Sequence, residues 1–410
     1  MKRAFPERMD TMKNGELVID ADGHILEPPD LWERYLEPRY RDRAMRIKRD
    51  SEGWEYLEIA GQPSRFCVRG SLTRLGSMGR EIDHMKERRE LWKAGKIDKP
   101  FIGLSPDEGY MKDLAFGAMD PKERVQRLDQ EGISKAVIYP TIGIMWEPEC
   151  PDLDLAYAYC RAYNRWIADF CRDSGGRLVP IAHISLADPA RAVEELQRAV
   201  KDGCKGAFCI PFTLTRKPHG HPFHDPIFAA LQDLDIPLGF HPNGTEPDDL
   251  TLHQRFDNMK GPARIWYSDM FVGAGTQMPF DTLFMYGVFD KFPKLRVVVL
   301  ESGAGWIGWW LDRADNLYKG TILGGALPLR EPPSYYFNRQ CFISADPDEQ
   351  RLALIADSVG PDKFFWASDF PHSDHRGDYM EELEELVQKM SPQAARGILG
   401  ENVARAYNLM

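Results

Sequence analysis

Residues 205–243 alternate between strand-like and helix-like segments: KGAFCIPF at 205–212, FHDPIFAALQDLD at 223–235 and IPLGFHPN at 236–243. Short apolar runs are typical of buried strands, whereas apolar residues that recur every three or four positions indicate a helix. The segment just upstream, 189–202, again has apolar residues at helical spacing. A helix between two strands predicts parallel strands that are joined by right-handed crossovers.

The same alternation extends in both directions along the chain. Six further strand-like runs lie at 16–24, 136–141, 177–186, 296–303, 340–347 and 364–372. Eight strands with intervening helices favour a closed (β/α)8 TIM-like barrel over an open sheet. The alternative, a doubly wound sheet, normally has a glycine-rich turn after its first strand, and ADGHILEPPD at 21–30 is not one. We therefore predict one barrel domain over residues 1–410.

Three segments interrupt this alternation. Residues 26–118 are rich in proline, charge and aromatic side chains, and we expect them to form an inserted cap after the first strand. Residues 244–276 and 320–339 are expected to be irregular excursions. The first two segments should emerge at the C-terminal end of the barrel, where active sites of such barrels lie. Between them and the last strands, Trp306, Trp309 and Trp310 have helical spacing and are expected to pack against the barrel.

Composition excludes several classes of protein. Of the 410 residues, 43% are hydrophobic and 28% charged, and a net charge of -11 argues against a nucleic-acid partner. The seven cysteines are scattered, which predicts free thiols in a reducing compartment. We find neither an N-terminal apolar segment typical of a signal peptide nor an apolar run of the roughly 20 residues that cross a bilayer. We therefore expect a cytoplasmic protein that does not associate with membranes.

Polar side chains occur where four of the predicted strands end. They are Asp22 and His24 in the first, His241 in the fifth, Glu301 in the sixth, and Asp369 and His372 in the eighth. Each alone has an ordinary explanation, such as a hydrogen-bonded structural histidine or an aspartate that caps a turn or a helix. In a barrel, however, all of these strand ends meet in one cup.

A metal ion would explain this joint placement. Burying two carboxylates and two imidazoles without a cation would cost several kcal/mol for each uncompensated charge. A divalent metal removes that cost. Asn243, just past His241, is a candidate for orienting a substrate. We expect His183 to be a core residue or a support for the site, and His219, His221 and His224 to lie in a solvated loop.

Five motifs in order carry a family resemblance. They are IDADGHILEPP at 19–29, GFHP at 239–242, FPKLRVVVLESGAGW at 292–306, WASDFPH at 366–372 and GENVAR at 400–405. The sequence resembles the amidohydrolase-related group (amidohydrolase 2 type). Within it, the chain is most similar to the branch that contains aminocarboxymuconate-semialdehyde decarboxylase and the hydroxybenzoate decarboxylases. The resemblance runs from about residue 16 to 410 but does not cover the insertion at 26–118.

The resemblance implies a barrel with one divalent metal ion and no organic cofactor. The implied ligands are Asp22, His24, His241 and Asp369, and by ligand softness the ion is Zn²⁺, Mn²⁺ or Fe²⁺. Two positions depart from the family pattern: Asp22 stands where relatives often have His or Glu, and Glu301 where many have a catalytic His. Members of the family often dimerise, so a homodimer is expected.

Two reactions fit these residues. In the first, a small planar carboxylic acid, aromatic or enol-type, loses CO₂ without oxidation; Asp369 shuttles the proton, and Glu301 or His372 assists. In the second, a metal-activated water hydrolyses an amide, ester, lactone or C–C bond. A barrel that binds a ligand without turnover is a third possibility, because a fold alone does not define a function. We take decarboxylation as the working prediction.

Overall fold

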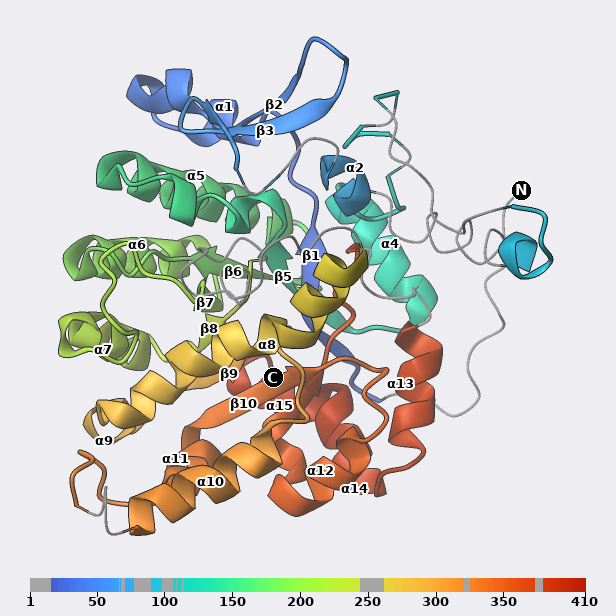
Figure 1. The fold of residues 1–410 in the computed structure, drawn as a ribbon. Coiled ribbons are helices and arrows are strands. Elements are labelled where there is room, and N and C mark those ends of the chain that lie inside the picture. Colours follow the sequence, from blue (N-terminus) through green and yellow to red (C-terminus); the bar gives the residue numbers. More distant parts are fainter. Residues whose placement is uncertain are drawn as a thin grey trace.

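The protein folds as eight parallel strands surrounded by helices (Figure 1). The computed structural model describes residues 16–65, 67, 71–76, 90–97, 106–107, 109–112, 114–243, 262–320, 325–372 and 379–410. The strands of the barrel, in their order in the sheet, are β1 (Ile19–Ile25), β5 (Lys135–Pro140), β6 (Leu178–His183), β7 (Gly206–Cys209), β8 (Leu238–Phe240), β9 (Val297–Val299), β10 (Cys341–Ala345) and β11 (Phe364–Trp366). The predicted barrel is confirmed.

Two backbone hydrogen bonds bring the last strand back to the first. His24 N donates to Phe370 O at 2.7 Å, and Asp369 N donates to Asp22 O at 2.9 Å. All residues of β1 and of β6–β11 are buried, as expected when helices cover the outside of a parallel barrel. Side chains from both surfaces of the sheet therefore belong to a continuous core.

Several of the outer helices have capping residues at their ends. Asp120, Asp152 and Asp188 each precede a helix and accept hydrogen bonds from backbone N–H groups of its first turn. Gly132, with φ of 74°, ends the first of these helices in the left-handed conformation that glycine favours. The helices from α4 onward are α4 (Pro121–Glu131), α5 (Leu153–Arg172), α6 (Pro189–Asp202), α7 (Asp225–Asp233), α8 (Pro262–Met285), α9 (Val288–Lys291), α10 (Ile307–Lys319), α11 (Pro333–Gln340), α12 (Leu352–Val359), α13 (Tyr379–Val387), α14 (Pro392–Arg396) and α15 (Asn402–Ala406).

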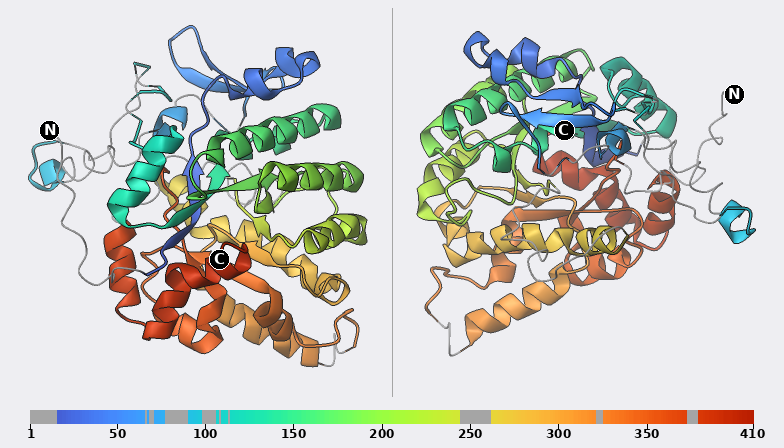
Figure 2. Two further views of the ribbon diagram at one scale, coloured as in Figure 1. Left: turned by 180° about the vertical axis from the view of Figure 1, so that it is seen from behind. Right: turned by 45° about the horizontal axis from the view of Figure 1, so that its top comes forward.

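The 26–118 insertion contains α1 (Leu31–Tyr35), the 3-10 helix η1 (Pro38–Arg43), α2 (Ser71–Gly76) and an antiparallel sheet of β2 (Arg46–Arg49), β3 (Glu55–Ile59) and β4 (Gln62–Pro63). The part that contains α1, β2 and β3 lies near α5, at the top of Figure 1 and in both views of Figure 2, whereas α2 lies beside α4. Tyr35 donates a hydrogen bond to Asp169 on α5, and Tyr159 of α5 accepts one from Ala60 N. Its role as a cap stays a prediction, and much of residues 66–113 lies outside the described residues.

Three expectations outside the strands are wrong. The excursions at 244–276 and 320–339 are not wholly irregular, because α8 begins at Pro262 and α11 at Pro333; residues 244–261 lie outside the described part. Trp310 is buried under α8, but Trp309 is 69% exposed because it lies on the outer side of α10.

All seven cysteines are free and buried, as predicted. No helix within the described ranges is long and apolar enough to cross a membrane.

Candidate metal centre

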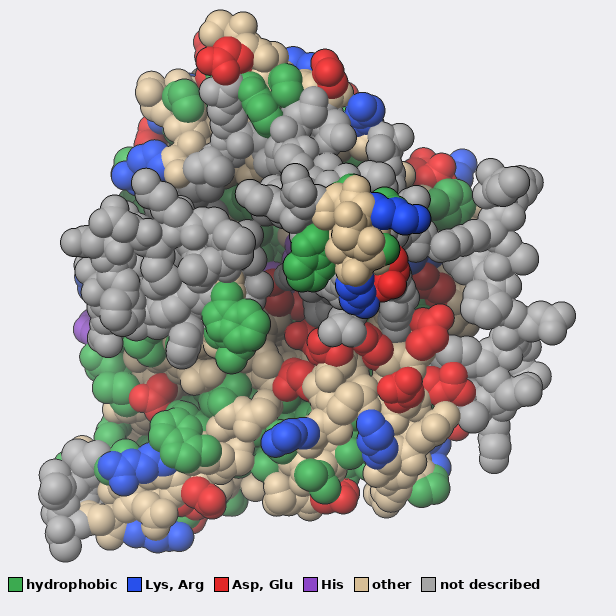
Figure 3. All heavy atoms as spheres, turned by 45° about the vertical axis from the view of Figure 1, so that its right-hand side comes forward, with side chains coloured by type: hydrophobic (Ala, Val, Ile, Leu, Met, Phe, Trp, Pro, Cys, Tyr) green, Lys and Arg blue, Asp and Glu red, His purple; other side chains and the backbone are tan. Residues whose placement is uncertain are grey.

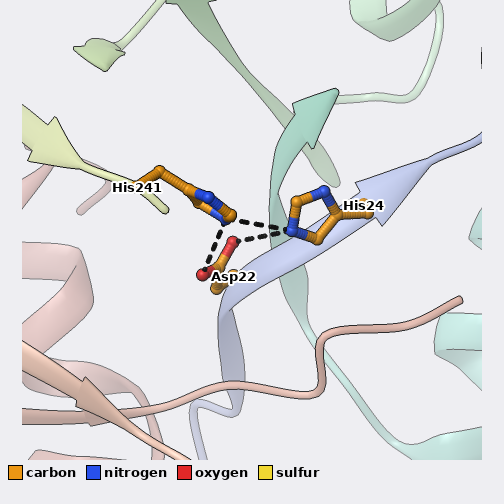
Figure 4. A group of neighbouring side chains, drawn as sticks. All are labelled: Asp22, His24 and His241. Atoms are coloured by element: carbon orange, nitrogen blue, oxygen red, sulfur yellow. Dashed lines mark hydrogen bonds and ion pairs between the residues drawn. The ribbon is translucent and has the colours of Figure 1, made fainter. Parts of the chain in front are cut away.

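Asp22, His24 and His241 point toward one another at the C-terminal end of the barrel (Figure 4). His24 Nε2 lies 3.4 Å from Asp22 Oδ1, and His241 Nε2 lies 3.4 Å from Asp22 Oδ2. All three side chains are buried. Asp22 and His24 come from β1, and His241 follows β8, so the barrel brings together residues that are more than 200 positions apart. One ligand atom from each of these side chains lies within 4.8 Å of the others.

The hydrogen bonds of the two histidines determine which ring nitrogens face inward as acceptors. His24 Nδ1 lies 2.6 Å from Pro140 O, and His241 Nδ1 lies 2.6 Å from Pro242 O. A carbonyl oxygen can only accept, so each Nδ1 carries a proton, and in the neutral ring each Nε2 presents a lone pair. The two Nε2 atoms are nevertheless 3.1 Å apart. Two lone pairs at that distance would repel, so either a proton on one of these nitrogens or a bound cation must lie between them.

The buried carboxylate of Asp22 also favours a positive charge at this position. Asp22 Oδ1 accepts no hydrogen bond from any residue that the structure describes. Burial opposes ionisation of Asp22, but His241 and His24 outweigh it and lower the pKa of the carboxyl. Burial also disfavours a charged His241, yet Asp22 and Glu301 raise the pKa of this imidazole to about 9. Without a metal ion, His241 is therefore an imidazolium that carries a second proton on Nε2. A divalent cation bound by Asp22, His24 and His241 could replace that proton.

A second cluster adjoins this centre. Asp369 Oδ1 lies 3.3 Å from His24 Nε2 and 2.9 Å from His372 Nδ1. His372 Nε2 in turn lies 3.0 Å from Thr141 Oγ1. Asp369 is 2% exposed whereas His372 is 14% exposed, so His372 is the more solvent-accessible member of the pair. Asp369 is thus placed both to join the ligand set and to exchange protons with His372.

Glu301 lies on the other side of His241. Its Oε2 atom is 3.6 Å from His241 Nδ1, the nitrogen that faces away from the other ligands. Glu301 and Asp369 both have a left-handed backbone, with φ of 42° and 50°. Such strain in residues other than glycine tends to occur at functional sites. Asn243 is buried beyond His241 and donates to Ile144 O at 3.5 Å.

Acidic side chains also gather near the middle of the face drawn in Figure 3. This concentration agrees with the net charge of -11.

Sequence reasoning missed several neighbours of the site. Tyr139 lies with its ring centroid 5.3 Å from that of His241 and shares a 2.8 Å hydrogen bond with Tyr407. Asp20 bonds to Ser368 beside Asp369. The spacing of Asp20, two residues before Asp22, was a signal in the sequence that it shares a strand face with the ligands.

His183, His219 and His224 belong to neither of the two groups of possible metal ligands. As expected, His183 is a core residue: it stacks on Phe208 and pairs with the buried Glu147 at 3.4 Å. The expectation of a solvated loop is wrong for His219 and His224, which are both buried. His219 Nε2 bonds to Ile210 O and His224 Nδ1 bonds to His219 O, so tertiary packing encloses the loop.

The sequence is similar to that of known amidohydrolases and decarboxylases. Residues 151–409 match the family model described as amidohydrolase. The γ-resorcylate decarboxylase of Rhizobium sp. is 26% identical over 288 residues, which cover 68% of this chain and 85% of that protein. The γ-resorcylate decarboxylase of Rhodococcus jostii is 24% identical over 274 residues, covering 64% of this chain and 80% of that protein.

Solved structures share the architecture. An amidohydrolase from Mycobacterium avium subsp. paratuberculosis has a TM-score of 0.77 at 23% identity and covers 96% of this chain and 98% of that one. A 5-carboxyvanillate decarboxylase from Novosphingobium aromaticivorans, solved with bound manganese and 3-methoxy-4-hydroxy-5-nitrobenzoic acid, has a TM-score of 0.64 at 20% identity, covering 96% of this chain and 97% of that one. At these identities the likeness establishes the barrel fold.

Proposed function

Because the chain belongs to the amidohydrolase family, we propose that it is a metal-dependent, non-oxidative decarboxylase of an aromatic carboxylic acid. The observation that carries the proposal is the convergence of Asp22, His24 and His241 on one point, each with an atom that can bind a metal ion. Asp369 lies at the edge of this set. The relatives named γ-resorcylate decarboxylase support the reaction class.

We expect the cation to be held by Asp22, His24, His241 and Asp369. Two carboxylates and two imidazoles suit Mn²⁺, Zn²⁺ or Fe²⁺, and the manganese-bound neighbour favours Mn²⁺. When bound, the cation would supply positive charge that attracts the carboxylate of the substrate and a neighbouring oxygen. His241 keeps its orientation through Pro242 O and the nearby Glu301 carboxylate.

Proton transfer falls to Asp369 and His372. Asp369 in its protonated form gives the proton to the ring carbon that carries the carboxylate. The C–C bond then breaks, its electron pair restores the ring, and CO₂ leaves. His372 returns a proton to Asp369 across the 2.9 Å contact, and Thr141 holds the far nitrogen of His372. Asn243, buried beside the ligands, orients the substrate.

Hydrolysis is the second candidate. Glu301 is 23% exposed and adds a carboxylate beside His241 that can take a proton from water. A decisive assay supplies Mn²⁺-loaded protein with 2,6-dihydroxybenzoate and with 5-carboxyvanillate, and follows CO₂ and the phenol product by mass spectrometry. Parallel reactions contain aryl amides, esters and lactones.

The expected result is CO₂ release that depends on added metal and is lost in Asp369→Asn. The exposed Asp357→Asn on α12 makes the same chemical change away from the centre and should keep full activity. Metal-dependent hydrolysis without CO₂ would replace the proposal with the second candidate. Specific binding of these acids with no product would instead favour a barrel that only binds its ligand.

A further inference from the structure

The metal centre spans the junction at which β1 and β11 close the barrel. Asp22 and His24 belong to β1, whereas Asp369 follows β11. Two backbone hydrogen bonds, from His24 N to Phe370 O and from Asp369 N to Asp22 O, join the two segments here. The distance between the ligands of β1 and Asp369 therefore depends on how this junction is held.

The carboxylate of Asp20 crosses the junction. Its Oδ1 atom accepts from Ser368 N at 2.9 Å and from Asp22 N at 3.3 Å, and its Oδ2 atom accepts from Ser368 Oγ at 2.6 Å. Ser368 Oγ in turn accepts from Phe370 N at 3.0 Å. One buried side chain thus contacts the backbone of one ligand, Asp22, and of the residue that precedes another, Asp369.

Gly23 provides the space that Asp20 occupies. A Cβ atom at position 23 would lie 2.7 Å from Asp20 Oδ2 and 3.5 Å from Arg124 Nη1. The pairing of β1 with β5 shifts register between Asp20 and Gly23, so the strand is irregular at this point. Arg124 is also buried; it donates to His24 O and to Gly117 O, and its guanidinium lies 4.5 Å from the centre of the Phe370 ring. Its positive charge accompanies the Asp20 carboxylate in the interior.

We propose that Asp20 is a positioning residue that fixes Asp22 and His24 relative to Asp369 and thereby sets the affinity and geometry of the metal centre. Asp20 is not itself one of the proposed metal ligands. The inference rests on the proposed metal-dependent function. Residues that support metal ligands through hydrogen bonds typically change metal affinity by about 10- to 100-fold when they are removed.

The test is a Mn²⁺ titration of metal-free protein, followed by electron paramagnetic resonance of the bound ion. Asp20→Ala removes all three acceptor contacts and should raise Kd by about 10- to 100-fold, with an altered spectrum of the remaining bound ion. Asp20→Asn keeps an oxygen that accepts from Ser368 N and Asp22 N, so it should restore most of the affinity. If Asp20→Ala does not fold, Ser368→Ala removes the two contacts of the hydroxyl, to Asp20 Oδ2 and from Phe370 N, and keeps the hydrogen bond from Ser368 N to Asp20. It should give a smaller change in the same direction.

Glu195→Gln is the matched control. Glu195 is another buried carboxylate with a hydrogen bond from Asn164 and an ion pair with Arg198, but it lies on α6. This variant should unfold more easily while its Mn²⁺ affinity and spectrum stay as in the wild type. If the Asp20 and Ser368 variants also lose only thermal stability, the inference is overturned. If wild-type protein binds no Mn²⁺, the proposed function itself fails.

Discussion

Metal binding should raise the thermal stability of this protein by a calculable amount. The folded protein brings together Asp22, His24 and His241, which unfolding disperses, so a cation held by them would bind the folded state preferentially. Such binding stabilises by about 2.7 kcal/mol at 100 times Kd and about 4.1 kcal/mol at 1,000 times Kd. For 410 residues, an unfolding entropy near 2.1 cal/mol/K per residue gives about 0.86 kcal/mol/K. The expected rise in Tm is therefore about 3 °C and then about 5 °C.

Differential scanning calorimetry across a Mn²⁺ series measures this rise. His241→Ala removes one of the converging nitrogens and should abolish the dependence on Mn²⁺ over the same concentration range. His221→Ala also removes an imidazole, but outside the centre, and should keep the full shift. An equal rise in Tm for wild type and His241→Ala would show that the ion stabilises the protein from a site that does not include His241.

Three further predictions follow from single features. His372→Ala should lower kcat for CO₂ release by about 100-fold or more while one metal ion stays bound, because a proton donor is lost; unchanged turnover would exclude His372 from proton transfer. Burial lowers the pKa of His219 from 6.5 to about 4, so the unfolded chain binds the extra proton between these values. The free energy of unfolding should therefore decrease as the pH is lowered from about 6.5 to about 4, by up to about 1.4 kcal/mol per pH unit. In denaturation experiments on His219→Gln, the free energy of unfolding should depend less steeply on pH in this range. Light scattering should give a homodimer of about 94 kDa, twice 46.9 kDa, whereas a mass of one chain would contradict this expectation.

The sequence predicted the strands and the candidate metal ligands best, because both can be recognised from short local patterns. The barrel strands were predictable because each is a short apolar run, and four of them end in residues that can bind a metal ion or transfer a proton. The positions of Asp22, His24 and His241 followed from strand ends that must meet in a parallel barrel. α8 was partly missed because it is rich in aromatic and methionine residues on several sides and contains Pro279, which obscures a helical pattern.

Other features depend on contacts that no local pattern reveals. His219 is buried by its hydrogen bond to Ile210 O and the surrounding fold, although its segment has the composition of a surface loop. Trp309 shares the spacing of its neighbours, yet faces outward. The bond between Asp20 and Ser368 joins residues that are 348 positions apart, so only the closed barrel brings them together.

The junction of β1 and β11 also determines when during folding the centre can exist. Two of the proposed ligands, Asp22 and His24, lie on the first strand of the barrel, and Asp369 follows the last, so a growing chain cannot complete the set before β11 has been made. Contacts between residues this distant in sequence form late, because ordering the intervening chain costs entropy before the contact contributes stability. Metal uptake should therefore report the final step of maturation. A partly unfolded protein that releases only β11 would lose its ion while most of its secondary structure persists.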